Sequence, residues 1–189
     1  MKLRSFIAVR VPPTPALRHT LRQLNEMGRT LRAVSPDNLH LTLRFLGDTD
    51  PSLFDEIAGA MTAAVVDVQP FAIHWQGMGV FPDARRPSVL WVGAAAQTPL
   101  PQIVGRLNPQ LDALGFTPER RPWQAHLTVA RIKAKPPTSF WPFLEQHATT
   151  DFGSVPVDSI ELLTSDLRPT GPVYSVTRTV PLAVAGGSK

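Results

Sequence analysis

The sequence predicts an α+β fold in which a β-α-β-α-β unit occurs twice. Some short segments alternate apolar with polar residues, as half-buried strands do, and others repeat apolar residues at helical spacing. The order of these segments restarts near the middle of the 189-residue chain. This length suits one domain, which we expect to span residues 1–189 as two lobes that share a core.

The first half, about residues 3–80, is expected to hold three strands and two helices. Thr14 followed by Pro15 is a typical helix start, and Pro36 ends the stretch that follows. Asp50 is a candidate cap for the second helix. The expected elements are a strand at 3–9, a helix at 15–32, a strand at 39–46, a helix at 51–66 and a strand at 70–80.

The second half, about residues 88–164, follows the same order. Its expected elements are a strand at 88–95, a helix at 99–114, a strand at 123–132, a short helix at 138–147 and a strand at 155–164. A final strand is expected at 173–182, followed by a frayed tail at 185–189.

One short motif occurs once in each half. Residues 40–43 read His-Leu-Thr-Leu and residues 126–129 read His-Leu-Thr-Val, so the two histidines are 86 positions apart. The same shift carries the first strand onto residues 89–95 and the first helix onto 101–118. We interpret this match as an internal duplication, whose pseudo-twofold axis would bring the two motif strands together.

The two motifs could act on a phosphate. On a strand, residues i and i+2 share a face, so His40 stands beside Thr42 and His126 beside Thr128. An imidazole titrates near pH ~6.5, so one ring can accept a proton while the other donates one. The two hydroxyls could bind the nonbridging oxygens, and the nearby Arg131 could add charge-assisted hydrogen bonds.

Two plainer interpretations apply to the same residues. One His-x-Thr alone is most simply a structural pair on a strand, because Thr is a favoured strand residue. A metal site is the other alternative, but catalytic zinc takes about three protein ligands and neither motif contains Asp or Glu. The recurrence at matching positions favours a shared site without a metal.

Composition limits the partners and the compartment. The net charge of +4 and the pI near 10.1 permit an anionic partner without requiring one. The absence of cysteine excludes disulfides, thiol nucleophiles and thiolate metal sites. No segment approaches the ~18 apolar residues of a membrane span. We therefore expect a cytoplasmic protein that does not contact a membrane.

At these motifs the chain resembles the RNA 2′,3′-cyclic phosphodiesterase family, once described as 2′-5′ RNA ligases, within the two-histidine phosphoesterases. The signature of that superfamily is a strand motif His-x-Thr-hydrophobic that occurs twice. Longer phrases are also similar, and the resemblance covers nearly the whole chain. These phrases lie at residues 37–47, 79–82, 86–93, 165–167 and 171–174.

The resemblance implies a fold whose antiparallel sheets line a central cleft with helices outside, and a reaction that needs no metal or other cofactor. It implies hydrolysis of a 2′,3′-cyclic phosphate, at an RNA end or on a nucleotide, to a 2′-phosphate. His40 and His126 become the acid–base pair, with His126 favoured to activate water. Thr42, Thr128 and Arg131 become the phosphate ligands. We also expect a monomer.

Some residues depart from the family pattern. Ala125 stands where the family usually has Pro, which should loosen the approach to the second motif strand. Trp123 replaces the commoner Phe and could either stack on a base or fill the core. Strict alternation would place Arg131 on the opposite face from the histidine of its strand, so a bulge or its long side chain must redirect it.

Two further residues are candidate substrate contacts. Arg44 is in phase with His40 and could be a second phosphate ligand. His74 lies opposite the apolar face of its strand and could meet the substrate. Basic residues could also guide an RNA strand, although each could equally be a solvated surface charge; they include Arg85, Arg86, Arg120 and Arg121.

Two rival functions remain open from the sequence. The first is RNA end-joining, in which the reverse reaction forms a 2′-5′ bond. The second is a binding module that holds RNA ends without turnover. The intact pair of histidines argues against the binding module, because binding alone does not require a titrating group at both positions.

Overall fold

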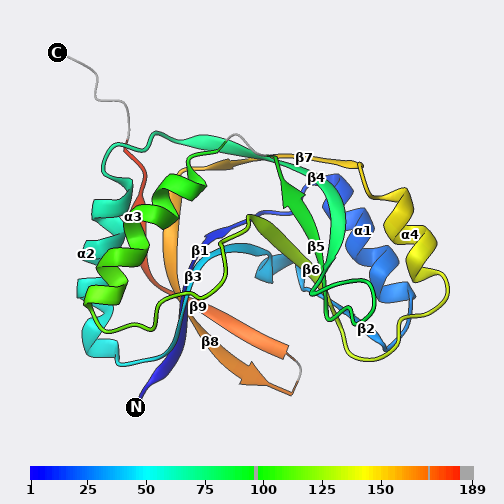
Figure 1. Cartoon of the computed structure of the whole chain (residues 1–189), viewed down its shortest axis with the longest axis horizontal. Coiled ribbons are helices and arrows are strands. Elements are labelled where there is room, and N and C mark those ends of the chain that lie inside the picture. Colours follow the sequence, from blue (N-terminus) through cyan, green and yellow to red (C-terminus); the bar gives the residue numbers. More distant parts are fainter. Residues whose placement is uncertain (96–97, 170, 184–189) are drawn as a thin grey trace.

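A computed structural model describes residues 1–95, 98–169 and 171–183 (Figure 1). The tail expected at 185–189 lies outside these residues. Two antiparallel sheets make up the centre of the fold, as predicted for the α+β class. One sheet has the order β3-β1-β8-β9, from strands His40–Thr49, Leu3–Arg10, Ser159–Arg168 and Gly171–Pro181. The other has the order β2-β6-β5-β4-β7, from strands Leu31–Ala33, His126–Ile132, Val89–Ala94, Phe71–Phe81 and Asp151–Val157.

Each sheet combines strands from both halves of the sequence. β3 and β1 of the first half pair with β8 of the second, while β6 and β5 of the second half pair with β4 of the first. The two sheets share one plan: a motif strand (β3 or β6) pairs with the first strand of its own half (β1 or β5), which pairs with a strand of the other half (β8 or β4). The offset between the halves is not constant. Arg10 pairs with His40 and Gly93 pairs with His126, so the partners of the two histidines are 83 positions apart, whereas the histidines themselves are 86 apart. The sequence halves therefore do not coincide with the two sheets.

The first helix is shorter than the sequence predicts. α1 (Pro15–Glu26) starts as expected, with the Thr14 hydroxyl accepting a hydrogen bond from the backbone N–H of Leu17. It ends early because Gly28 adopts a left-handed φ of 97°, which stops the helix. Residues 31–33 then form β2, an edge strand that pairs with β6. The prediction of helix at 27–32 was wrong, because Leu31 is buried as a strand residue.

The strand predicted at 155–164 is in fact two strands. β7 ends at Val157 and β8 begins at Ser159, so Asp158 alone separates them. β7 pairs with β4 in the five-stranded sheet, whereas β8 pairs with β1 in the other. The alternation of apolar and polar residues continues through both strands, so the sequence pattern does not reveal the change of sheet.

The helices cover the outer sides of the sheets (Figure 1). α2 (Phe54–Val65) and α3 (Leu100–Ala113) pack on each other and against β9 and β3. α1 packs against β2, β6 and β7, and α4 (Phe140–Gln146) follows on the same side. Among the residues that the structure describes, no helix has both the length and the apolar character needed to cross a membrane.

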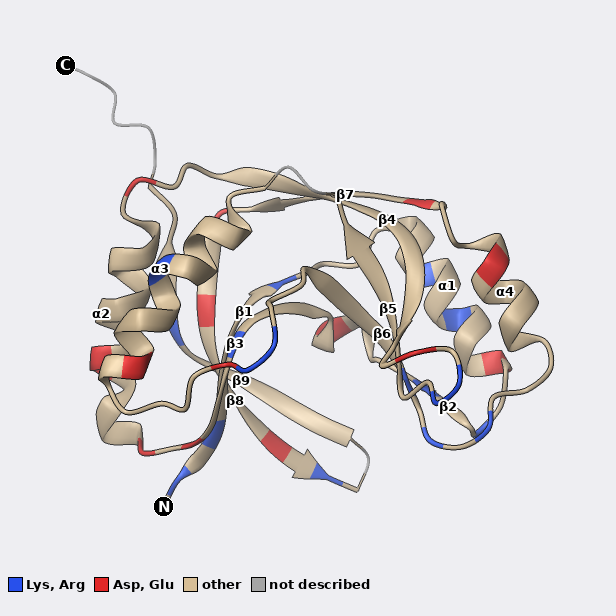
Figure 2. Cartoon of the chain, viewed as in Figure 1, with Lys and Arg blue, Asp and Glu red and all other residues tan. Residues whose placement is uncertain are grey.

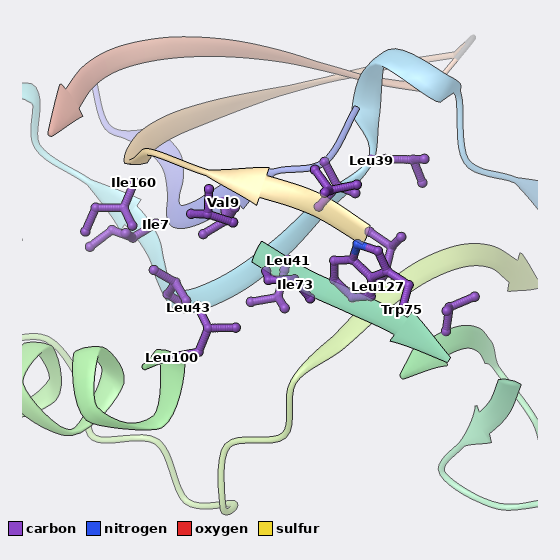
Figure 3. Close-up of a cluster of buried hydrophobic side chains, with 14 of the residues drawn as sticks. Ile7, Val9, Leu39, Leu41, Leu43, Ile73, Trp75, Leu100, Leu127 and Ile160 are labelled. Atoms are coloured by element: carbon purple, nitrogen blue, oxygen red, sulfur yellow. The ribbon is translucent and has the colours of Figure 1, made fainter. Parts of the chain in front are cut away.

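One hydrophobic core joins the two sheets (Figure 3). It contains the alternating aliphatic residues of both motif strands, and Leu41, Leu127 and Val129 have no exposed surface. Ile73 and Trp75 of β4, predicted to share a face, are also completely buried. Because neighbouring side chains on a strand point to opposite faces, the histidine and threonine of each motif lie on the side away from this core.

Candidate active site

The two motif strands contact each other, one from each sheet. On the side away from the core, His40 and Thr42 of β3 and His126 and Thr128 of β6 are half-buried. Arg131 of β6 is exposed and close enough to His40 for its charge to influence that imidazole. We call the surface formed by these five residues the histidine face.

Both imidazoles are held by the same backbone contact. Nδ1 of His40 lies 2.7 Å from the carbonyl oxygen of Asn38, and Nδ1 of His126 lies 2.8 Å from that of Gln124. A carbonyl oxygen can only accept, so Nδ1 donates in each ring. In the neutral ring the lone pair is then on Nε2, which can accept a proton. The contact uses only backbone atoms before the histidine, so it forms with Ala125 in place of proline.

Aromatic side chains support both imidazoles. The ring of His40 has its centroid 4.9 Å from that of Phe6 and 5.1 Å from that of Tyr174, which is edge-on at 87°. The ring of His126 lies 5.0 Å from that of Phe81, edge-on at 89°. Edge-to-face packing of this kind restrains the ring orientation. Sequence reasoning did not identify these aromatic neighbours as parts of the site.

Burial lowers the pKa of His40 below its usual value of 6.5. The positive charges of Arg131 and His126 act in the same direction, while the hydrogen bond to Asn38 opposes them. In the free protein the surroundings therefore favour the neutral form of His40.

Matching β-bulges bring Arg131 to the histidine face. Ala8 pairs with Thr42 and Ile7 with Arg44, so Leu43 is an extra residue in β3. In the second half, Trp91 pairs with Thr128 and Leu90 with Ala130, so Val129 is an extra residue in β6. A bulge shifts the alternation by one residue. Arg131 is therefore exposed on the same side as Thr128, as the bulge alternative required.

The same shift turns Arg44 into the interior. Its side chain is only 1% exposed, and it donates hydrogen bonds to Oδ1 of Asn108 at 2.8 Å, Oδ1 of Asp112 at 2.7 Å and the carbonyl oxygen of Thr117 at 2.8 Å. These partners hold the guanidinium away from the histidine face. The structure thus contradicts the expectation that Arg44 contacts the phosphate, because strict alternation from His40 ignores the bulge.

Phe45 takes the place on β3 that Arg131 has on β6. The two positions are 86 residues apart, and both follow the bulge by two residues. The Phe45 side chain is 58% exposed, which is unusual for a large apolar residue. Sequence reasoning missed it, although the offset of 86 from Arg131 points to this position.

The phosphate-binding candidates have no competing partners in residues 1–95, 98–169 and 171–183. The hydroxyls of Thr42 and Thr128 make no hydrogen bond there, and the guanidinium of Arg131 forms no ion pair. In the described part of the chain, no three His, Asp or Glu side chains are grouped so that they could hold a metal ion. The histidine face therefore presents free hydrogen-bond donors.

The other two candidates have structural contacts. The indole Nε1 of Trp123 donates to the carbonyl oxygen of Thr42 at 3.0 Å, and the ring packs against the core. His74 contacts Ser154 Oγ at 3.0 Å and Asp151 at 3.5 Å near the outer strand β7. The strand register places His74 beyond β5, two strands away from β6. The structure therefore does not bring His74 to the histidine face.

The fold and this pair of motif strands define a two-histidine phosphoesterase architecture, and comparison with known proteins agrees. Residues 11–169 match the 2′-5′ RNA ligase superfamily. The chain belongs to this superfamily. A curated relative from Archaeoglobus fulgidus, named RNA 2′,3′-cyclic phosphodiesterase, is 32% identical over 93% of this chain and 98% of its own. A relative of the same name from Aquifex aeolicus is 36% identical over 76% of this chain and 77% of its own.

Solved structures share the fold. The protein TT0787 of Thermus thermophilus superimposes with a TM-score of 0.78 at 27% identity, over 95% of this chain and 97% of that one. LigT of E. coli, solved in complex with 3′-AMP, has a TM-score of 0.73 at 23% identity, over 97% of this chain and all of that one. The likeness to LigT supports the fold alone.

Proposed function

We propose that this protein hydrolyses 2′,3′-cyclic phosphates at RNA ends or on nucleotides to 2′-phosphates, without a metal. The observation that carries the proposal is the matched pair of imidazoles, each with Nδ1 committed to a backbone carbonyl and Nε2 left to exchange a proton. The names of the relatives, RNA 2′,3′-cyclic phosphodiesterase, support the same reaction.

The reaction needs two proton transfers at one phosphorus. A neutral imidazole takes a proton from water, and the water oxygen forms a bond to phosphorus. The bond from phosphorus to the 3′ oxygen breaks, and the other, protonated imidazole gives that oxygen its proton. The product is a 2′-phosphate with a free 3′-hydroxyl, and proton exchange with solvent restores both rings. Well-placed acid and base groups contribute about 10²–10⁴-fold each.

Thr42, Thr128 and Arg131 are proposed to hold the nonbridging oxygens. Negative charge builds on these oxygens in the transition state, where fixed donors stabilise it most. A guanidinium makes stronger hydrogen bonds to such oxygens than a neutral donor does. The free hydroxyls and the unpaired Arg131 of the histidine face, in the described residues, suit this role.

His126 is the proposed base and His40 the proposed acid. This assignment requires the bound substrate to raise the pKa of His40, because burial lowers it in the free protein. The negative charge of a bound phosphate acts in that direction, since it favours the protonated imidazole. In the opposite assignment His40 is the base, a role for which the neutral form is already the suitable one.

The test is phosphorus NMR of the product formed from a nucleoside 2′,3′-cyclic phosphate in EDTA. We expect a 2′-phosphomonoester, with turnover reduced by orders of magnitude in His40→Ala and in His126→Ala. His74→Ala is the matched control and should keep wild-type activity. Loss of activity in EDTA, or a 3′-phosphate product, would overturn the proposal. RNA binding without turnover would instead favour the binding module.

The natural partner and setting are part of the same proposal. We propose that the substrate is an RNA with a 2′,3′-cyclic end, and that the protein acts as a monomer in the cytoplasm. The lack of cysteine suits a reducing compartment. Sedimentation of the purified protein with and without RNA measures the oligomeric state, and joining of RNA ends at high concentration would reveal the reverse reaction.

A further inference from the structure

A surface hollow adjoins the histidine face and has no part in the proposed chemistry. Its volume is about 540 Å³, and it lies between β3 and the segment that connects α3 to β6. Its lining consists of Phe45, Leu46 and Gly47 of β3 together with residues 117–121. We call it the flanking hollow.

A series of packed aromatic rings connects the histidine face to the flanking hollow; its middle ring, Phe6, is buried, and Phe45 is the exposed end. The ring of Phe45 lies 6.3 Å from that of Phe6, which in turn lies 4.9 Å from the imidazole of His40. More than half of the Phe45 side chain is exposed. Exposed aromatic rings in single-stranded nucleic acid sites bind bases by stacking, with little dependence on sequence.

The other wall of the hollow is a loop fixed to β3 at two points. The buried guanidinium of Arg44 donates to the carbonyl oxygen of Thr117 at 2.8 Å. Six residues later, the indole of Trp123 donates to the carbonyl oxygen of Thr42 at 3.0 Å. The loop between these points is therefore held beside the motif strand.

This loop presents two guanidinium groups to solvent. Arg120 and Arg121 are exposed, and neither makes an ion pair or hydrogen bond within residues 1–95, 98–169 and 171–183. Figure 2 shows the basic positions of the loop beside β3, between the two sheets. Glu119 precedes them and is also exposed. Guanidinium groups bind phosphate oxygens in a paired geometry.

The histidine face already accounts for the phosphate of a cyclic mononucleotide. A second phosphate, together with a second base, exists only where another nucleotide precedes the cyclic end. We propose that the flanking hollow binds this preceding nucleotide, with its base on Phe45 and its phosphate at Arg120 and Arg121. This inference rests on the proposed function and adds a preference, within its substrate class, for RNA strands of two or more nucleotides over mononucleotides.

Kinetics on two matched substrates test the inference. One is adenosine 2′,3′-cyclic phosphate, and the other is the adenosine dinucleotide with the same cyclic end. We expect Phe45→Ala, and separately the double variant Arg120→Ala/Arg121→Ala, to raise KM for the dinucleotide about ten-fold. Both variants should leave kcat/KM for the mononucleotide unchanged. Phe45→Tyr, which keeps an aromatic ring, should restore the wild-type KM.

The charge-matched control is Arg18→Ala/Arg22→Ala, which removes two exposed guanidinium groups from α1. It should affect neither substrate. Equal losses on both substrates in the Phe45 or Arg120/Arg121 variants, or no loss on either, would overturn the inference.

The failure of the proposed function would look different, because the wild type would then hydrolyse neither substrate. Calorimetric binding of the two uncleaved cyclic substrates, mononucleotide and dinucleotide, would replace kinetics in that case. The hollow is supported if only the dinucleotide loses affinity in the variants, and it is overturned if both lose affinity equally or neither does.

Discussion

The two motif strands share the same histidine contact and the same bulge, but they differ in the residues that follow the bulge. β3 and β6 each hold a histidine by the backbone carbonyl two residues earlier, and each has a bulge one residue after the threonine. After the bulge, β3 continues with a buried arginine and an exposed phenylalanine, whereas β6 continues with a buried alanine and an exposed arginine. The shared features position the proposed acid and base, while the residues after the bulge differ in what they offer a substrate.

The difference has a physical logic. One cation beside the reacting phosphate is enough to offset its charge, and a second would also oppose protonation of the imidazoles. The β3 arginine is instead used inside the protein, where Arg44 binds Asp112 and the loop that lines the flanking hollow. In a duplicated strand pair, the histidines and threonines can thus stay equivalent while the residues that contact the substrate differ between the two strands.

The largest expected effect distinguishes the chemical roles of the two strands. With His126 as the base and His40 as the acid, His40→Ala should lose about 10²–10⁴-fold in turnover on a cyclic nucleotide. Sulfur in place of the 3′ oxygen makes a leaving group that needs no proton, so this variant should recover most of its activity on the sulfur substrate. His126→Ala should not recover. The reverse pattern, measured by single-turnover kinetics, would exchange the two roles.

Arg44 should matter for stability more than for chemistry. Its replacement by Met removes a buried cation from Asp112, Asn108 and Thr117, so we expect a loss of about 3 kcal/mol in the free energy of unfolding. Urea denaturation measures this loss. Arg178→Met, which breaks an exposed pair with Asp55, should cost less than about 1 kcal/mol. Equal losses in both variants would show that burial of Arg44 is unimportant.

Arg131 should matter for chemistry and not for stability. Loss of a charge-assisted contact to the phosphate costs about 1.5–3 kcal/mol, so Arg131→Ala should lower kcat/KM for a cyclic mononucleotide roughly 10- to 100-fold. The kcat/KM of Arg131→Lys should lie between those of the wild type and Arg131→Ala, because lysine keeps the charge but lacks the paired hydrogen-bond geometry of a guanidinium. Phe45→Ala, at the equivalent position of β3, is the control and should leave mononucleotide hydrolysis unchanged. A wild-type rate in Arg131→Ala would remove this residue from the site.

The smallest expected effect concerns pH. Because burial lowers the pKa of His40 in the folded state, the unfolded chain binds more protons as the pH falls below about 6.5, and stability decreases. The stability associated with neutral His40 is fully present above this pH. We expect His40→Gln to reduce the loss of stability between pH 7 and pH 5, as measured by urea denaturation at each pH. His19→Gln on α1 is the control, and an unchanged pH dependence in His40→Gln would contradict the burial argument.

The sequence predicted what depends on local pattern. The alternation of polar and aliphatic residues located both motif strands, and the offset of 86 related them. The sequence pattern could not show where the alternation of buried and exposed residues is interrupted, because a bulge is a property of the pairing between strands. Arg44 was therefore assigned to the histidine face, and Phe45 was missed.

Two errors in the predicted fold have different causes. The helical spacing of apolar residues continues past Glu26, but Gly28 ends α1 and Leu31 joins a sheet. A single alternating stretch crosses Asp158, but tertiary pairing divides it between the two sheets. At Asp158 partners distant in sequence decide the structure, whereas at Gly28 the stop signal is local and the helical spacing alone did not reveal it.

We propose that the two motif strands form one acid–base site. Single-turnover hydrolysis of a cyclic nucleotide by His40→Ala, His126→Ala and the double variant tests it most directly. Because groups that act as a unit are not additive, we expect the double variant to be about as slow as the slower single variant. Wild-type turnover in either single variant, or losses that multiply fully in the double variant, would contradict a shared site.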